Sequence, residues 1–200
     1  MPYACIRAII YLVYLILYRF RVLGRENVPP GGAVVCANHT SLADPVLAAL
    51  AFKANDRPFF MAKSELFKNP LFGLLIKLLG AFPVERGASD LGALKHSLEL
   101  LREGKKLLMF PQGTRFSDAE TLELKSGVAM LALRTGLPIL PVYITQGRKL
   151  FINRIEVSIG VPFTPERKPG QDKNEAYHQI TSRLAADIQA LRPCKQKECL

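Results

Sequence analysis

The strongest chemical signal in this chain is a histidine followed five residues later by an aspartate, His39 and Asp44. A carboxylate that bonds one imidazole nitrogen fixes the ring's tautomer and stabilises the imidazolium that forms when the other nitrogen takes a proton. The pair is therefore a candidate general base with its orienting group. A second interpretation also fits: an ordinary helix capped by Ser41, with Asp44 in its first turn and His39 only forming a turn.

The flanking residues predict how this pair is positioned. An apolar run over residues 33–37 ends at a polar turn, and a second apolar run occupies residues 46–52. This pattern favours a buried strand that delivers His39 to a turn, followed by a helix over residues 41–52. Asp44 then lies in the first turn of that helix, from which its carboxylate can reach back to the imidazole.

Alternating strand and helix patterns extend through the rest of the 200 residues. We predict strands at residues 33–37, 58–62, 81–84, 106–110, 139–144 and 154–159, and helices at residues 41–52, 71–79, 90–103, 126–135 and 174–191. Ser89 or Asp90 is a suitable cap for the helix at 90–103, and Gly104 a suitable stop. The alternation predicts a single α/β domain with a mainly parallel central sheet flanked by helices.

Two further segments place groups suited to an anion directly after predicted strands. One contains Arg86, and the other is Gln-Gly-Thr-Arg at residues 112–115. In the second segment Gly113 lets backbone approach a ligand closely, Thr114 offers a hydroxyl donor, and Arg115 offers a planar fork for phosphate.

The predicted topology brings these groups to one place. Ligands of open α/β sheets gather outside the carboxyl ends of the strands, where His39, Arg86 and Arg115 are all expected. The alternative is that the two arginines are surface residues in ordinary ion pairs.

Four segments, in order and spacing, resemble the motifs of the glycerolipid acyltransferase family, the lysophosphatidic acid acyltransferases (1-acylglycerol-3-phosphate O-acyltransferases). The His-x4-Asp pattern of His39 and Asp44 is similar to the first motif, and residues 81–87, 110–115 and 137–142 are similar to the second, third and fourth. The resemblance covers roughly residues 22–160. The third motif usually has a glutamate where this chain has Gln112, so any role of that charge is not carried over.

The resemblance implies transfer of a fatty acyl group from acyl-carrier protein or acyl-CoA to the free hydroxyl of lysophosphatidic acid, which gives phosphatidic acid. His39 is then the general base oriented by Asp44, and Arg86 and Arg115 hold the acceptor's phosphate. No metal or resident cofactor is expected, because the thioester is a co-substrate. Further candidates for substrate contact are Gln112, Gly113, Thr114, Lys63 and Lys125.

Three alternatives remain open at this point. The acceptor can be another lysophospholipid or an amine-bearing lipid. Thr40 or Ser41 can be a nucleophile activated by His39, although side chains so close in sequence to their base rarely have the right geometry. Finally, the chain can be an inactive membrane-binding module in which Gln112 marks decay of the site.

The N-terminal segment predicts contact with a membrane surface. Residues 8–18 form an uncharged apolar run of eleven residues, too short for the roughly 20 that a spanning helix needs. We predict a helix within residues 1–24 that lies in one leaflet, with its tyrosines on one side and Arg19, Arg21 and Arg25 near lipid phosphates. Residues 25–200 are then the acyltransferase domain. The alternative is a helix packed on the domain's own core.

The charge balance fits an anionic partner. There are 27 Lys and Arg against 17 Asp and Glu, a net charge of +10, which suits phospholipid headgroups or phosphorylated substrates. The charges are dispersed and lack the aromatic interleaving of RNA-binding proteins, so a nucleic-acid partner is not expected. We expect a monotopic protein on the cytoplasmic face of the cell membrane, bound to anionic lipids.

Overall fold

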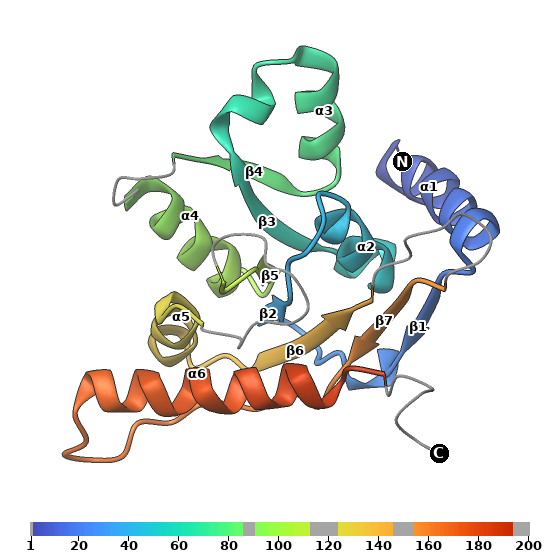
Figure 1. Ribbon diagram of the computed structural model, residues 1–200. Helices are drawn as coiled ribbons and strands as arrows, with labels where there is room; N and C mark the ends of the chain where they lie inside the picture. Colours follow the sequence, from blue (N-terminus) through green and yellow to red (C-terminus); the bar gives the residue numbers. More distant parts are fainter. Residues whose placement is uncertain (1, 86–90, 113–123, 146–153, 194–200) are drawn as a thin grey trace, which may run out of the picture.

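The central sheet of the computed structural model has seven strands in the order β1-β7-β6-β2-β5-β3-β4 (Figure 1). The structure describes residues 2–85, 91–112, 124–145 and 154–193. The strands are β1 (Arg21–Leu23), β2 (Ala33–Ala37), β3 (Pro58–Lys63), β4 (Ala81–Val84), β5 (Lys106–Met109), β6 (Ile139–Ile144) and β7 (Glu156–Ile159).

Most strand pairs are parallel, as predicted. β2 pairs with β5 and β6, β3 pairs with β4 and β5, and β1 pairs with β7, all in parallel. Only β6 and β7 form an antiparallel pair among the described strands. The carboxyl ends of β2 to β6 therefore meet along one edge of the sheet, while β7 reverses direction beside β6. The predicted strands match in position, but the three-residue β1 was too short for its pattern to be recognised.

Helices cover both faces of the sheet. They are α1 (Pro2–Tyr18), α2 (Asp44–Ala51), α3 (Pro70–Leu78), α4 (Leu91–Arg102), α5 (Gly127–Thr135) and α6 (Lys173–Ala190), with short 3-10 helices at η1 (Arg25–Asn27), η2 (Ala54–Asp56) and η3 (Ser64–Phe67). Side chains alternate across β2: Val35 and Ala37 join the core under α1, α2 and α3, whereas Val34 and Cys36 join the core under α4, α5 and α6. The result is a three-layer α/β domain (Figure 1).

The helix ends follow from local side chains. Asn69 accepts the N–H of Phe72 at the start of α3, and Asp172 accepts two N–H groups at the start of α6. The chain turns after α4 at Gly104, whose φ of 74° is the left-handed conformation that stops a helix. The predicted stop at Gly104 is thus confirmed, while the predicted caps Ser89 and Asp90 lie outside the described residues.

Helix α1 has two different sides. Its tyrosines, Tyr11, Tyr14 and Tyr18, pack against the core beneath α1 to α3, whereas its aliphatic residues Ile9, Leu12, Val13, Leu15 and Ile16 are exposed. The helix therefore does pack on the domain's own core, as the alternative interpretation had it, but through its tyrosines. No helix of the described residues combines the length and apolar character needed to cross a membrane.

Two arginines join the N-terminal region to the carboxyl end of α2. Arg7 donates from Nη2 to the carbonyl oxygens of Leu50 and Phe52, at 3.1 and 2.7 Å. Arg25, which the sequence assigned to lipid phosphates, donates from Nε to the carbonyl oxygen of Ala51 at 2.9 Å. The last carbonyls of a helix lack partners within it and carry partial negative charge, so cations suit this end.

Candidate active site

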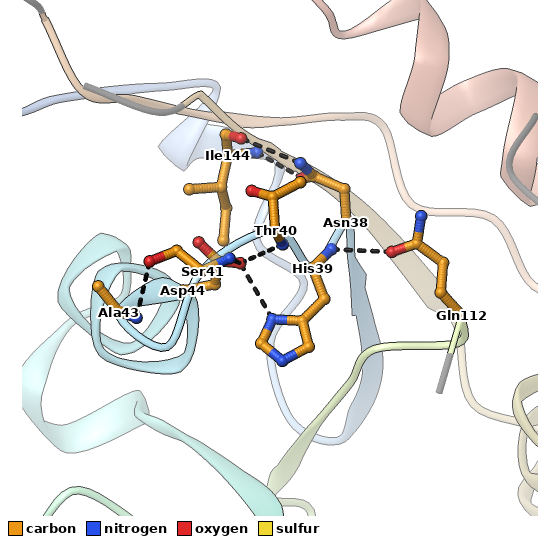
Figure 2. Close-up of polar contacts among 8 residues, drawn as sticks. All are labelled: Asn38, His39, Thr40, Ser41, Ala43, Asp44, Gln112 and Ile144. Atoms are coloured by element: carbon orange, nitrogen blue, oxygen red, sulfur yellow. Dashed lines mark hydrogen bonds and ion pairs between the residues drawn. The ribbon is translucent and has the colours of Figure 1, made fainter. Parts of the chain in front are cut away.

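His39 lies just beyond β2, at the edge where the parallel strands end. The residue before it, Asn38, is buried and holds the end of β2 to that of β6: its Nδ2 donates to the carbonyl oxygen of Ile144 at 3.0 Å, and its Oδ1 accepts the Ile144 N–H at 2.7 Å (Figure 2). The amide thus replaces the next backbone pair that the two strands would have made. This contact fixes where the chain leaves the sheet and so fixes the position of the His39 backbone.

Asp44 holds the imidazole of His39. Its Oδ2 lies 3.0 Å from Nδ1 and also accepts the backbone N–H groups of Thr40, at 2.6 Å, and Ser41, at 2.7 Å (Figure 2). The carboxylate side chain is 0% exposed and the imidazole 13%. Because an ionised carboxylate can only accept, Nδ1 carries the proton and Nε2 keeps a free lone pair. This is the tautomer that a general base needs.

The helix after His39 starts later than predicted. α2 begins at Asp44, its N-cap is Ala43, and the cap makes no side-chain hydrogen bond. Ser41 is therefore not the cap, and its Oγ instead accepts the N–H of Ala43 at 3.2 Å. The reason is that the Asp44 carboxylate accepts the preceding N–H groups itself, which folds residues 40–43 into a turn before the helix. Asp44 still lies in the first helical turn, as predicted.

Two residues after β5 also contact His39. The Phe110 ring stacks on the imidazole, with centroids 4.2 Å apart and planes 27° from parallel. Gln112 accepts the backbone N–H of His39 on its Oε1 at 2.9 Å (Figure 2). Sequence reasoning did not single out Phe110. Its signal was available: β5 is the parallel neighbour of β2, with Cys36 paired to Met109, so the next residues must lie beside the His39 turn.

Helix α1 borders the same site. Burial raises the pKa of Tyr14, and the nearby Tyr18 hydroxyl and Asp44 carboxylate raise it further. The second carboxylate oxygen of Asp44, Oδ1, is buried and has no hydrogen-bond partner among the described residues. All three hydrogen-bond contacts of the buried Asp44 side chain among the described residues are therefore made by one oxygen, Oδ2.

The remaining candidates are placed only in part. Lys63 ends β3 at the same sheet edge, is exposed, and pairs with Glu65 at 2.8 Å. Lys125 is exposed and its backbone N–H donates to the carbonyl oxygen of Pro111 at 2.9 Å, which places it against the loop that carries Gln112. Arg86, Gly113, Thr114 and Arg115 lie outside the described residues.

Known proteins similar to this chain include several enzymes of one activity. Two 1-acyl-sn-glycerol-3-phosphate acyltransferases, from Streptococcus pneumoniae (strain ATCC BAA-255 / R6) and Borreliella burgdorferi (strain ATCC 35210 / DSM 4680 / CIP 102532 / B31), are 32% and 30% identical over 79% of this chain. The matched parts are 60% and 62% of those enzymes' own lengths. The enzyme of the same name from Bacillus subtilis (strain 168) is 30% identical over 86% of this chain and 83% of its own.

A solved structure has a similar fold. The 1-acyl-sn-glycerophosphate (LPA) acyltransferase PlsC from Thermotoga maritima matches with a TM-score of 0.65 and 30% identity, over 88% of this chain and 74% of that one. The family model described as Acyltransferase matches residues 19–145, which include β2, the His39 turn, α2 and the loop after β5. The chain therefore belongs to the Acyltransferase family.

Proposed function

We propose that this protein transfers a fatty acyl group from an acyl thioester to the free hydroxyl of lysophosphatidic acid, giving phosphatidic acid. The observation that carries the proposal is the His39–Asp44 pair at the carboxyl edge of the sheet, with Nδ1 bonded and Nε2 left with its lone pair. Membership of the Acyltransferase family and the activity named for the relatives support the same reaction. A decayed site would not be expected to keep this buried pair with its supporting turn.

The proposed reaction starts at Nε2 of His39. Nε2 takes the proton of the acceptor hydroxyl as its oxygen attacks the thioester carbonyl, and the Asp44 carboxylate stabilises the imidazolium that forms. The tetrahedral intermediate then expels the thiolate, which takes the proton back from the imidazolium. The products are the ester and the free thiol of acyl-carrier protein or CoA. No acyl-enzyme, metal or resident cofactor takes part in this scheme.

The acceptor's phosphate is proposed to bind Arg86 and Arg115, supported by the hydroxyl of Thr114 and the open backbone at Gly113. Gly113, Thr114 and Arg115 follow β5, the direct neighbour of β2, whereas Arg86 follows β4, the edge strand beyond β5 and β3. Lys63 and Lys125 are proposed as further contacts because both are exposed at the His39 edge. Gln112 supports the site from behind, through the backbone of His39, and is not proposed to touch the phosphate.

Attachment to the membrane is proposed to be monotopic, on the cytoplasmic face, through the exposed aliphatic side of α1. The exposed residues are Ile9, Leu12, Val13, Leu15 and Ile16. This side faces away from the tyrosines that pack on the core, so the helix can enter one leaflet and stay docked on the domain. In this proposal α1 attaches the domain, whose central sheet includes β1 at Arg21–Leu23, to an anionic lipid surface.

The test is acyl transfer by the full chain. Purified protein in detergent is incubated with lysophosphatidic acid and, separately, acyl-carrier-protein and CoA thioesters, and phosphatidic acid is measured by mass. Loss of a general base costs about 10²–10⁴-fold, so His39→Ala should lose activity to that extent. His178→Ala is the matched control, because that histidine is exposed on α6. Equal activity of the His39 variant and wild type would refute the mechanism.

A further inference from the structure

Helix α3 is apolar on both of its sides. Its sequence, Pro-Leu-Phe-Gly-Leu-Leu-Ile-Lys-Leu, has one polar residue, Lys77. Gly73 and Ile76 are buried against the domain, while the opposite side exposes 82% of Leu71 and 58% of Leu74, with Phe72 and Leu75 exposed beside them. Helices that are apolar all round normally lie inside a protein or in a membrane. One side of α3 therefore packs on the domain, whereas the other side is exposed.

The domain holds this exposed side in a fixed position. Asn69 caps the helix and Pro70 occupies its first turn. Gly73 packs so closely on η3 that an added Cβ would lie 3.0 Å from the carbonyl oxygen of Phe67. Leu71 and Leu74 are therefore presented by a well-anchored helix.

The charges around α3 complement an anionic surface. Between residues 63 and 80 the sequence has three lysines, Lys63, Lys68 and Lys77, and one carboxylate, Glu65. Lys63 already pairs with Glu65 at 2.8 Å. Lys68 precedes the helix, and the Nζ of Lys77 near its end lies 5.9 Å from the Phe67 ring. Lysines at both ends of an apolar helix side are the arrangement that places ammonium groups among lipid phosphates.

The position of α3 relates this surface to the site. α1, α2 and α3 share one face of the sheet (Figure 1). The N-terminal end of α2 carries Asp44. The helices α1 and α3, with their exposed apolar sides, therefore belong to the same layer as α2, which carries Asp44.

We propose that the exposed side of α3, with Lys68 and Lys77, is a second membrane contact that enters the headgroup region of an anionic bilayer. The inference rests on the proposed function, because the His39 edge needs to face a membrane only if the acceptor is a lipid. Contact at α1 alone would leave the domain free to rotate about one helix. Contact at α1 and α3 together fixes its orientation and holds the His39 turn at headgroup depth.

The test measures binding of the full-length chain to phosphatidylcholine vesicles with and without phosphatidylglycerol, by co-sedimentation. In Leu71→Gln/Leu74→Gln we expect the partition coefficient to fall at least about tenfold. The control is Val161→Gln, because Val161 is 72% exposed but lies beyond β7, at the opposite edge of the sheet; it should bind as wild type does.

Lys68→Gln/Lys77→Gln should reduce the preference for phosphatidylglycerol while keeping the weaker binding to phosphatidylcholine. Circular dichroism melting verifies that each variant is folded.

The outcomes separate this inference from the proposed function. If wild type binds vesicles and the double leucine variant binds equally well, the α3 contact is refuted. If that variant binds vesicles normally but loses binding to acyl-carrier protein, α3 is a protein-docking surface and the inference is again refuted. Acyl transfer to lysophosphatidic acid dispersed in detergent is assayed separately, so a failure there refutes the function and not the α3 contact.

Discussion

The backbone N–H of His39 donates to Oε1 of Gln112 at 2.9 Å, so the loop after β5 holds the turn after β2. The bond joins the His39 turn to the segment whose sequence continues to Thr114 and Arg115. A carboxylate oxygen can accept the same bond as an amide oxygen. We therefore propose that Gln112 serves to order this loop by accepting one hydrogen bond, a role that requires no charge where the motif usually has a glutamate.

Gln112→Glu should consequently be tolerated, with kcat and both KM values within about threefold of wild type. Gln112→Leu removes the acceptor, and since a hydrogen bond contributes about 0.5–1.5 kcal/mol, kcat should fall roughly threefold to tenfold. Steady-state kinetics with each substrate varied in turn measure both. A rise in Gln112→Glu confined to the KM of the acceptor would mean that Gln112 touches the phosphate.

Asp44→Asn should separate activity from stability. The side-chain oxygen of asparagine can still accept the N–H groups of Thr40 and Ser41, so the turn persists. The imidazolium loses its counter-charge, and kcat should fall by about 10²-fold, less than in His39→Ala. Removing a buried anion with an unpartnered Oδ1 offsets the weaker hydrogen bonds, so we expect the free energy of unfolding to change by no more than about 1 kcal/mol.

Asp44→Ala is the matched comparison for this experiment. It leaves the Thr40 and Ser41 N–H groups without their acceptor and should destabilise the protein by about 1–3 kcal/mol. Thermal unfolding of wild type, Asp44→Asn and Asp44→Ala measures the two changes in stability. An Asp44→Asn protein as unstable as Asp44→Ala would show that the charge, and not the acceptor, holds the turn.

The sequence predicted the parts of this fold that repeat simple patterns. The buried run at 33–37 and the aliphatic run at 139–144 became β2 and β6 at the predicted residues, because fully buried parallel strands are continuously apolar. The start of α2 was predicted wrongly at residue 41, since a serine is ordinarily the better cap. Here the Asp44 carboxylate accepts N–H groups that precede the helix. This arrangement is visible in the structure but not in the sequence pattern.

The same distinction applies to the site. The contact between His39 and Asp44 was predictable from spacing, because both ends of it lie in one turn. The contacts of Asn38 with Ile144 and of Gln112 with His39 join residues 106 and 73 positions apart. Their partners depend on strand order, β6-β2-β5, which the alternation of strands and helices does not determine. Phe110 was overlooked for the same reason.

Phe110→Leu should lower kcat without unfolding the protein. The substitution keeps an apolar side chain of similar size but removes the ring stacked 4.2 Å from His39. Aromatic pairs contribute about 0.5–1.5 kcal/mol beyond their buried area, so we expect kcat to fall about twofold to tenfold as the imidazole loses its fixed plane. Phe59→Leu is the control, because Phe59 is also half-buried but packs on the other face of the sheet. Equal kcat for the two variants would contradict a role for the stack.

Arg7→Met tests how α1 is attached to the domain. Methionine keeps the aliphatic packing of the arginine stem but removes the donors to Leu50 and Phe52 at the carboxyl end of α2. Hydrogen bonds from charged groups contribute about 1.5–3 kcal/mol, whereas the Arg7 Nε is buried without a partner among the described residues, a cost that the substitution removes. The net loss should therefore be about 1 kcal/mol, or roughly 2–4 °C in Tm. Arg102→Met, at an exposed position on α4, should stay within about 0.5 kcal/mol of wild type. If Arg7→Met has the same Tm as Arg102→Met and wild type, the hydrogen bonds from Arg7 to the α2 carbonyls do not stabilise the protein. The tyrosines alone then hold α1 on the core.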